Sequence, residues 1–189
     1  IVIAGDIFHN KGKLDTPALK LYFNWLDKLL SLAPVIIICG NHDFRQEDPK
    51  HPDMIEALLV PYKNGHSPKF QIHYLKHSGL YVYNNIGFGT VSIKDTLRAY
   101  NTSGQNDTLP LFPNFKNINN GGTDGNIHDT NNTNNTINTI DCTCALFHGT
   151  ISQSSLPNGR QMTKGYPLEW FDNYDCILLG DNHKQQIHN

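Results

Sequence analysis

The sequence lacks a strong net charge of either sign. Its 15 lysine and arginine residues are nearly balanced by 17 aspartate and glutamate residues, which gives a formal charge of −2. No global basic field therefore attracts nucleic acid, and any contact with DNA has to be local. Four cations beside the polar motifs described below are either available for such contacts or simply solvated: Lys11, Lys13, Arg45 and Lys184.

The chain also lacks an apolar run long enough to cross a bilayer, and it shows no signal peptide. Its four cysteines form no disulfide pattern of the secreted type. Cys39 and Cys176 lie inside apolar runs and are expected to be small core residues. Cys142 and Cys144 form a C-x-C pair without the second pair that a structural zinc site needs. We therefore expect an intracellular, reduced protein that does not enter a membrane.

One stretch has too few apolar residues to fold by itself. Twelve Asn and seven Thr occupy the 41 positions of 101–141. Such a composition cannot bury enough apolar surface to offset the entropy lost on ordering. We expect a disordered, low-complexity insert at 101–141 within a single domain at 1–189. Asn-rich tracts are typical of AT-rich genomes, such as those of large DNA viruses or protists.

The remaining sequence alternates between helical and strand patterns. Residues 15–33 predict a helix, which Asp15 or Thr16 caps and whose apolar positions recur at helical spacing. A second helix is expected at 53–60, and a loop or short helix at 163–174. The segments 70–75, 79–85 and 87–93 are expected to be antiparallel strands. Strand, helix and strand over 1–39 predict a parallel βαβ unit.

Four short apolar runs end abruptly in polar clusters, over 1–9, 35–43, 145–149 and 176–183. Short Val/Ile/Leu runs are typical of buried strands, and α/β folds place their sites just past the ends of such strands. Glycines at these ends, for example Gly5 and Gly40, allow sharp turns and close approach. The clusters place eight polar side chains at strand ends: Asp6, His9, Asn41, His42, Asp43, His148, Asp181 and His183.

This set of side chains indicates a metal site. Carboxylate, carboxamide oxygen and imidazole suit Mn²⁺, Fe²⁺ or Zn²⁺ better than an all-oxygen Ca²⁺ site. A single cluster would be weak evidence, whereas four at strand ends favour a metal-dependent hydrolase.

The succession GD, GNHD, H and GDxH resembles the signature of the calcineurin-like metallophosphoesterases. Over roughly 1–94 and 140–189 the chain resembles the SbcD-type DNA repair exonucleases more specifically. The segments that carry this resemblance are GDIFHNKGKL, CGNHDFRQ, LFHGTI and LLGDNHKQQ. The resemblance implies an α/β sandwich of two mixed β-sheets flanked by helices. It also implies two divalent ions, Mn²⁺ above all, with Mg²⁺, Fe²⁺ or Zn²⁺ as alternatives.

By this resemblance, residues of all four motifs hold metal. One ion takes four ligands: Asp6, Asn41, His148 and Asp181. The other takes Asp6 and His183, together with an Asp-x-His motif that the family carries upstream and that this sequence lacks. The chain therefore resembles a fragment that is cut at both ends.

The resemblance also assigns catalytic roles. His42 corresponds to the general acid, Asp43 orients it, and His9 contacts the phosphate. At 181 the sequence departs from the family's usual Gly-His-x-His, because it reads Gly-Asp-Asn-His. A carboxylate there favours Mn²⁺ or Mg²⁺ over Zn²⁺, unless Asp181 only caps a turn. The other histidines belong to no motif and are expected at the surface: His51, His66, His73, His77, His128 and His188.

The favoured function is that of a DNA nuclease subunit that acts at DNA ends and pairs with an ABC-type ATPase of the SbcC/Rad type. A homodimer is a further expectation. Two alternatives stay open. One is a phosphatase or small-nucleotide phosphodiesterase with the same chemistry, and the other is a catalytically inactive binding module with the same fold.

Overall fold

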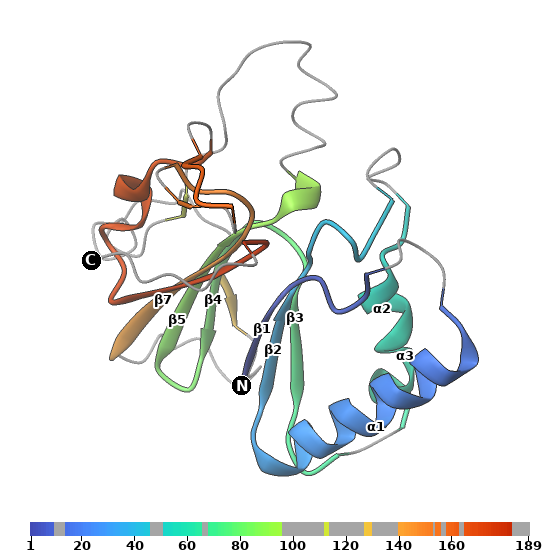
Figure 1. Ribbon diagram of the computed structural model, residues 1–189. Coiled ribbons are helices and arrows are strands. Elements are labelled where there is room, and N and C mark those ends of the chain that lie inside the picture. Colours follow the sequence, from blue (N-terminus) through green and yellow to red (C-terminus); the bar gives the residue numbers. More distant parts are fainter. Residues whose placement is uncertain are drawn as a thin grey trace.

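Two β-sheets pack against each other, and three helices cover the outer face of the first sheet (Figure 1). The computed structural model describes residues 1–9, 14–45, 51–65, 68–95, 112–113, 127–129, 140–152, 154–155, 158–162 and 165–182. The arrangement confirms the predicted α/β sandwich of two sheets flanked by helices.

The predicted long helix is α1, Thr16–Leu32. Asp15 caps it, because its side chain accepts a hydrogen bond of 2.8 Å from the main-chain N–H of Ala18. The face that packs against the sheet carries Tyr22, Leu26 and Leu30 at a spacing of four residues.

The first sheet has the order β1-β2-β3, with strands Val2–Ala4, Val35–Ile38 and Ile72–Leu75. All three are parallel, so the prediction of an antiparallel strand at 70–75 is wrong. The crossover between β2 and β3 carries α2 (Met54–Leu58) and α3 (Val60–Lys63), which return the chain to the same end of the sheet. The single helix predicted at 53–60 is thus divided, since Pro61 has no N–H to continue the helical hydrogen bonds.

The second sheet has the order β6-β4-β5-β7-β8. Strands β4 (Gly79–Tyr83) and β5 (Ile86–Val91) form the predicted antiparallel hairpin. Its two-residue turn has positive φ at Asn84 and Asn85, which is the backbone that tight hairpins require. Strands β7 (Cys142–His148) and β8 (Cys176–Gly180) extend this sheet in parallel.

Successive side chains of a strand point to opposite faces, so each strand contributes apolar residues both to the layer between the sheets and to the layer beneath the helices or loops. In β2, Val35 and Ile37 face the helices, whereas Ile36 and Ile38 face the second sheet. In β7, the inter-sheet positions include Leu146. The polar residues that follow both strands are therefore held at the ends of a packed double layer.

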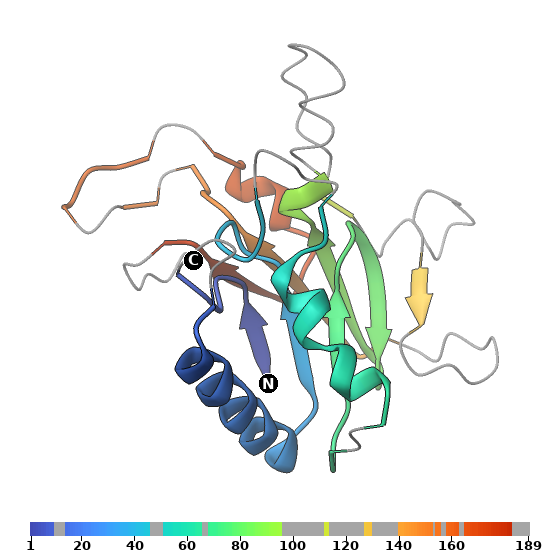
Figure 2. The same ribbon diagram turned by 90° about the vertical axis from the view of Figure 1, so that its right-hand side faces the viewer.

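The outer face of the second sheet is covered by the segment that contains the short 3-10 helix η2 (Leu168–Phe171). Phe112 packs there against Phe147, Phe171 and Tyr174, although it lies inside the predicted disordered insert. Within the same insert, β6 (Ile127–Asp129) pairs with β4 at the edge of the sheet (Figure 2). The rest of 101–141, apart from 112–113, 127–129 and 140–141, lies outside the described residues, so its disorder stays a prediction.

The histidines outside the motifs differ in burial. His51 and His77 are exposed, as expected. His73 is only 8% exposed, so the expected surface position is wrong for this residue. It faces the second sheet, where its ring lies 4.5 Å from the ring of Tyr83, and burial lowers its pKa. His66 and His188 lie outside the described residues, as does the side chain of His128.

Candidate metal centre

The loops that follow β1 and β2 are held together by one buried carboxylate. Asp43 is 0% exposed and accepts hydrogen bonds from four main-chain N–H groups. Those of Asp6 and Gly40 lie 2.8 Å from Oδ2, and those of Ile7 and Phe8 lie 3.0 and 3.4 Å from Oδ1. Burial raises the pKa of Asp43 to about 6, aided by the charge of Asp6, while the amide hydrogen bonds lower it. Asp43 thus fixes the loop that carries Asp6.

The absence of a side chain at two glycines permits this close approach. A Cβ at Gly40 would overlap the main-chain N and the carboxylate of Asp6. Gly5 has φ 84°, and a Cβ there would lie 2.5 Å from Nδ1 of His148. The ends of β1, β2 and β7 can therefore meet at one point.

The imidazole of His148 is buried and oriented. Its Nδ1 lies 2.6 Å from the carbonyl oxygen of Ala4, which can only accept, so Nδ1 carries the proton. In the neutral ring Nε2 then presents a lone pair, and this atom is buried without a hydrogen-bond partner among the described residues. It lies 3.4 Å from Oδ1 of Asp6 and 3.8 Å from Oδ1 of Asp181.

Asp181 is held from two sides. The amide Nδ2 of Asn41 donates to its Oδ1 over 3.2 Å, and the hydroxyl of Thr150 donates to its Oδ2 over 3.3 Å. This use of the Asn41 amide leaves Oδ1 of Asn41 buried and without a partner among the described residues. Sequence reasoning missed Thr150, which the fold alone brings to the site.

The side chains of Asp6, Asn41, His148 and Asp181 thus lie together at the ends of the strands. The ligand atoms of Asp6, His148 and Asp181 all lie within 4.8 Å of one another. The imidazole lone pair of His148 faces the carboxylates of Asp6 and Asp181, and the carboxamide of Asn41 contacts Asp181. Both the imidazole Nε2 and the carboxamide oxygen are buried and unpaired among the described residues. This is an unfavourable arrangement unless a cation sits among them. The residues therefore fit a divalent metal ion.

The main chain adopts an unusual conformation at both Asp6 and Asp181, as residues in functional sites often do. Asp6 has φ 54° and Asp181 has φ 80°, in the left-handed region that non-glycine residues rarely adopt. Such backbone strain gathers at binding and catalytic sites, where the surrounding structure maintains it.

Two histidines flank the donor set. The rings of His9 and His42 stack with centroids 5.2 Å apart, at an interplanar angle of 16°. Nδ1 of His42 lies 2.7 Å from the carbonyl oxygen of His9, and the main-chain N–H of His42 donates to Oδ1 of Asp6 over 2.9 Å. The carbonyl of His9 therefore orients His42. The prediction gave that role to Asp43, whose carboxylate instead accepts hydrogen bonds from main-chain N–H groups.

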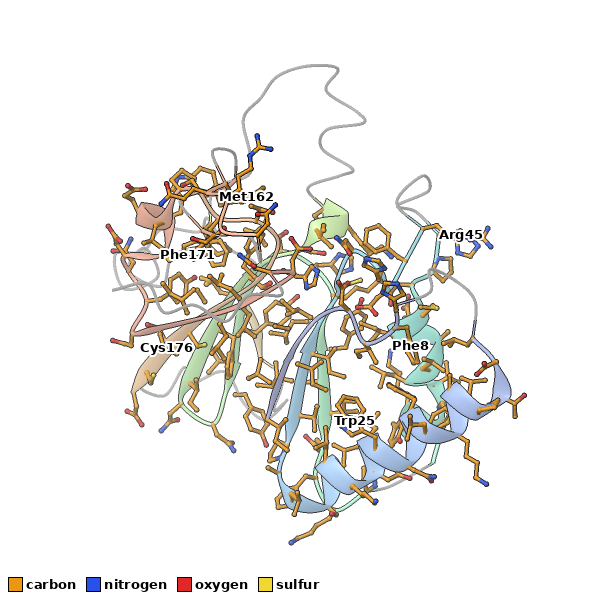
Figure 3. The ribbon with its side chains drawn as sticks, viewed as in Figure 1. Phe8, Trp25, Arg45, Met162, Phe171 and Cys176 are labelled. Carbon is orange, nitrogen blue, oxygen red and sulfur yellow. The ribbon has the colours of Figure 1, made fainter. Side chains whose placement is uncertain are left out.

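The remaining expected residues contribute no described contact. His183, Lys11, Lys13 and Lys184 lie outside the described residues. Arg45 is exposed and projects from the outer rim of the molecule, whereas Phe8 lies on the loop after β1 (Figure 3). Among the described residues, no helix is long and apolar enough to cross a membrane.

The double sheet with this donor set at its strand ends defines a metallophosphoesterase-type domain. Residues 1–185 match the sequence family of calcineurin-like phosphoesterases. The chain belongs to this family.

Two viral proteins are similar to the chain. The uncharacterized protein R555 of Acanthamoeba polyphaga mimivirus is 28% identical over 193 residues, which cover all of this chain and 12% of that protein. Protein 244L of Invertebrate iridescent virus 6, named as a candidate phosphoesterase, is 42% identical over 43 residues. These cover 23% of this chain and 15% of that protein. The chain thus spans a small part of the length of either relative.

Proposed function

We propose that this domain hydrolyses phosphodiester bonds in DNA with two divalent ions, Mn²⁺ above all, as an SbcD-type nuclease that acts at DNA ends. The observation that carries the hydrolytic chemistry is Nε2 of His148, which is buried between the carboxylates of Asp6 and Asp181 and has no hydrogen-bond partner among the described residues. Oδ1 of Asn41, whose amide contacts Asp181, is likewise buried and unpaired in the described part of the chain. The proposal that DNA is the substrate rests on the amino-acid sequences of the motifs, above all GDIFHNK and GDNHKQQ.

The first ion would be held by Asp6, Asn41, His148 and Asp181. Asp6 would also contribute to a second ion, together with His183. Bound divalent ions supply Lewis-acid activation of the phosphoryl group and of the attacking water. The carboxylate at 181 is harder than the imidazole usual in the family, which favours Mn²⁺ or Mg²⁺ over Zn²⁺.

The residues of the chain supply the proton transfer. Because Nδ1 of His42 is engaged by the carbonyl of His9, Nε2 is the atom left to act. A protonated His42 would donate its Nε2 proton to the leaving 3′ oxygen. Stacking on His9 keeps the ring in this orientation, and His9 itself would contact a phosphate oxygen.

The test compares His42→Gln with the unchanged protein on bis-p-nitrophenyl phosphate and on end-labelled duplex DNA. Loss of a general acid should lower the rate roughly 10²–10⁴-fold on both substrates while Mn²⁺ binding stays unchanged. Equal loss of metal and rate would assign His42 to ligation instead. Turnover of phosphomonoesters but not of DNA would favour the phosphatase alternative, and metal binding without any turnover would favour the inactive binding module.

By the same resemblance, we infer an ABC-type ATPase of the SbcC/Rad type as a partner, and a homodimer as the assembly. Coexpression of the protein with such an ATPase from the same genome tests this inference. A stable complex that cleaves DNA in an ATP-dependent manner is expected. A lone, monomeric nuclease would contradict it.

A further inference from the structure

Three of the four cysteines gather at one place on the second sheet. Cys142 and Cys144 are two residues apart on β7 and therefore point to the same face. Cys176 on β8 is the direct neighbour of Cys144 in the parallel pairing, so it shares that face. The sequence offered no reason to expect a zinc site at Cys142 and Cys144, because the second pair of ligands is missing. The fold places a third thiol beside them.

The three thiols differ in access. Cys144 is buried at 3% exposure within the inter-sheet layer, and Cys142 is half-buried. Cys176 is exposed, so its expected core position is wrong. The thiol of Cys176 lies close to both β7 thiols. Burial, reinforced by the proximity of Cys176, raises the pKa of Cys144. Cys176 is thus the thiol that a reagent in solution reaches first.

The geometry favours a disulfide over a metal site. Among the described residues, the only cluster of His, Cys, Asp and Glu tight enough to hold a metal ion is Asp6, His148 and Asp181. Neighbouring strands lie about 4.8 Å apart, inside the range of roughly 4.4–6.8 Å between the Cα atoms of a disulfide. Cys142 is displaced two residues along β7, which puts its Cα about 8 Å from that of Cys176 and beyond that range.

We propose that Cys144 and Cys176 form a reversible disulfide that ties β7 to β8, and that Cys142 stays reduced. The site lies at the start of β8, whose other end leads to Asp181, and Figure 3 shows Cys176 far from the loop that carries Phe8. Four residues of β7, or about 13 Å, separate Cys144 from His148. The disulfide would therefore covalently join the two strands that lead to His148 and Asp181, away from the metal ligands themselves.

A peroxide is the oxidant. The Cys176 thiolate attacks one peroxide oxygen, the O–O bond breaks and hydroxide leaves, which yields a sulfenic acid. The hydroxide takes up the proton that the Cys176 thiol lost on ionising and becomes the first water. The sulfur of Cys144 then attacks the Cys176 sulfur, the S–O bond breaks, and water leaves with the proton of the Cys144 thiol. Two thiols are oxidised, one peroxide is reduced, and the products are one disulfide and two waters.

The experiment treats the folded 189-residue chain with hydrogen peroxide, alkylates the remaining thiols after unfolding, and maps the linkage by digestion and tandem mass spectrometry. We expect a peptide linked through Cys144 and Cys176, with Cys39 and Cys142 alkylated, and release of the link by dithiothreitol. Cys142→Ser is the matched control and should form the same link, whereas Cys176→Ser should abolish it.

Mapping the disulfide linkage in the unsubstituted chain tests the proposal even if a variant does not fold. A link between Cys142 and Cys176 would overturn the assignment of the pair. Alkylation of all four cysteines, or overoxidation of Cys176 alone, would overturn the proposed disulfide.

Discussion

Gly40→Ala should abolish metal binding although it replaces none of the proposed metal ligands. A Cβ at this position would lie closer than 3.0 Å to the main-chain N and to Oδ1 of Asp6, and 2.9 Å from the carbonyl carbon of Gly5. These atoms belong to the loop that Asp43 clamps, so they cannot swing aside as a flexible side chain would.

The magnitude follows from this overlap. Restoring an ordinary carbon–oxygen contact requires a shift of the Asp6 carboxylate on the order of 1 Å. Metal–ligand distances tolerate only about 0.2 Å, so Asp6 would leave the donor set. Overpacking of this kind also costs roughly 1–3 kcal/mol of folding stability.

The assay is calorimetric titration with Mn²⁺, combined with thermal unfolding followed by circular dichroism. Gly159→Ala is the matched control, because a Cβ there meets nothing within 4 Å. Its φ of 83° makes the substitution cost about 1–2 kcal/mol in backbone strain while metal affinity stays unchanged. A folded Gly40→Ala variant that bound Mn²⁺ like the unchanged protein would refute the reasoning.

Three further outcomes are expected. Phe112→Ala should destabilise the fold by about 3–5 kcal/mol in denaturant unfolding, because a buried ring leaves the outer layer of the second sheet. Asp181→His should shift the affinity ratio from Mn²⁺ toward Zn²⁺ in competitive titrations, since imidazole is the softer ligand. Burial lowers the pKa of His73 below 6.5, so the unfolded state binds the extra proton and stability falls as pH drops below about 6.5. The melting temperature of His73→Phe should depend less on pH over that range.

The sequence was sufficient to predict that the side chains of Asp6, Asn41, His148 and Asp181 lie together. Asp6, Asn41 and His148 each follow a short apolar run. Parallel pairing aligns the ends of β1 and β2 in the first sheet and those of β7 and β8 in the second, and the packing of the two sheets brings these ends together. The four donors therefore meet although 140 positions separate Asn41 from Asp181. Periodicity likewise predicted α1 and the hairpin of β4 and β5.

Interactions that depend on tertiary contacts could not be predicted. Nothing local distinguishes a strand that pairs in parallel with β2 from one that forms a hairpin, which is why the direction of β3 was wrong. The support of Asp181 by Thr150 and of His42 by the carbonyl of His9 depends on loops from separate strands. Phe112 is one aromatic residue in a polar tract, and its burial depends on a surface that only the folded sheet provides.

The most direct test of the central claim is a crystal structure of the protein soaked with Mn²⁺, with data collected at the manganese absorption edge. The four-donor site predicts an anomalous peak about 2.0–2.3 Å from a carboxylate oxygen of Asp6, Oδ1 of Asn41, Nε2 of His148 and a carboxylate oxygen of Asp181. A protonated Nε2 of His148 bonded to Asp6, with no anomalous peak between the carboxylates at saturating Mn²⁺, would contradict it.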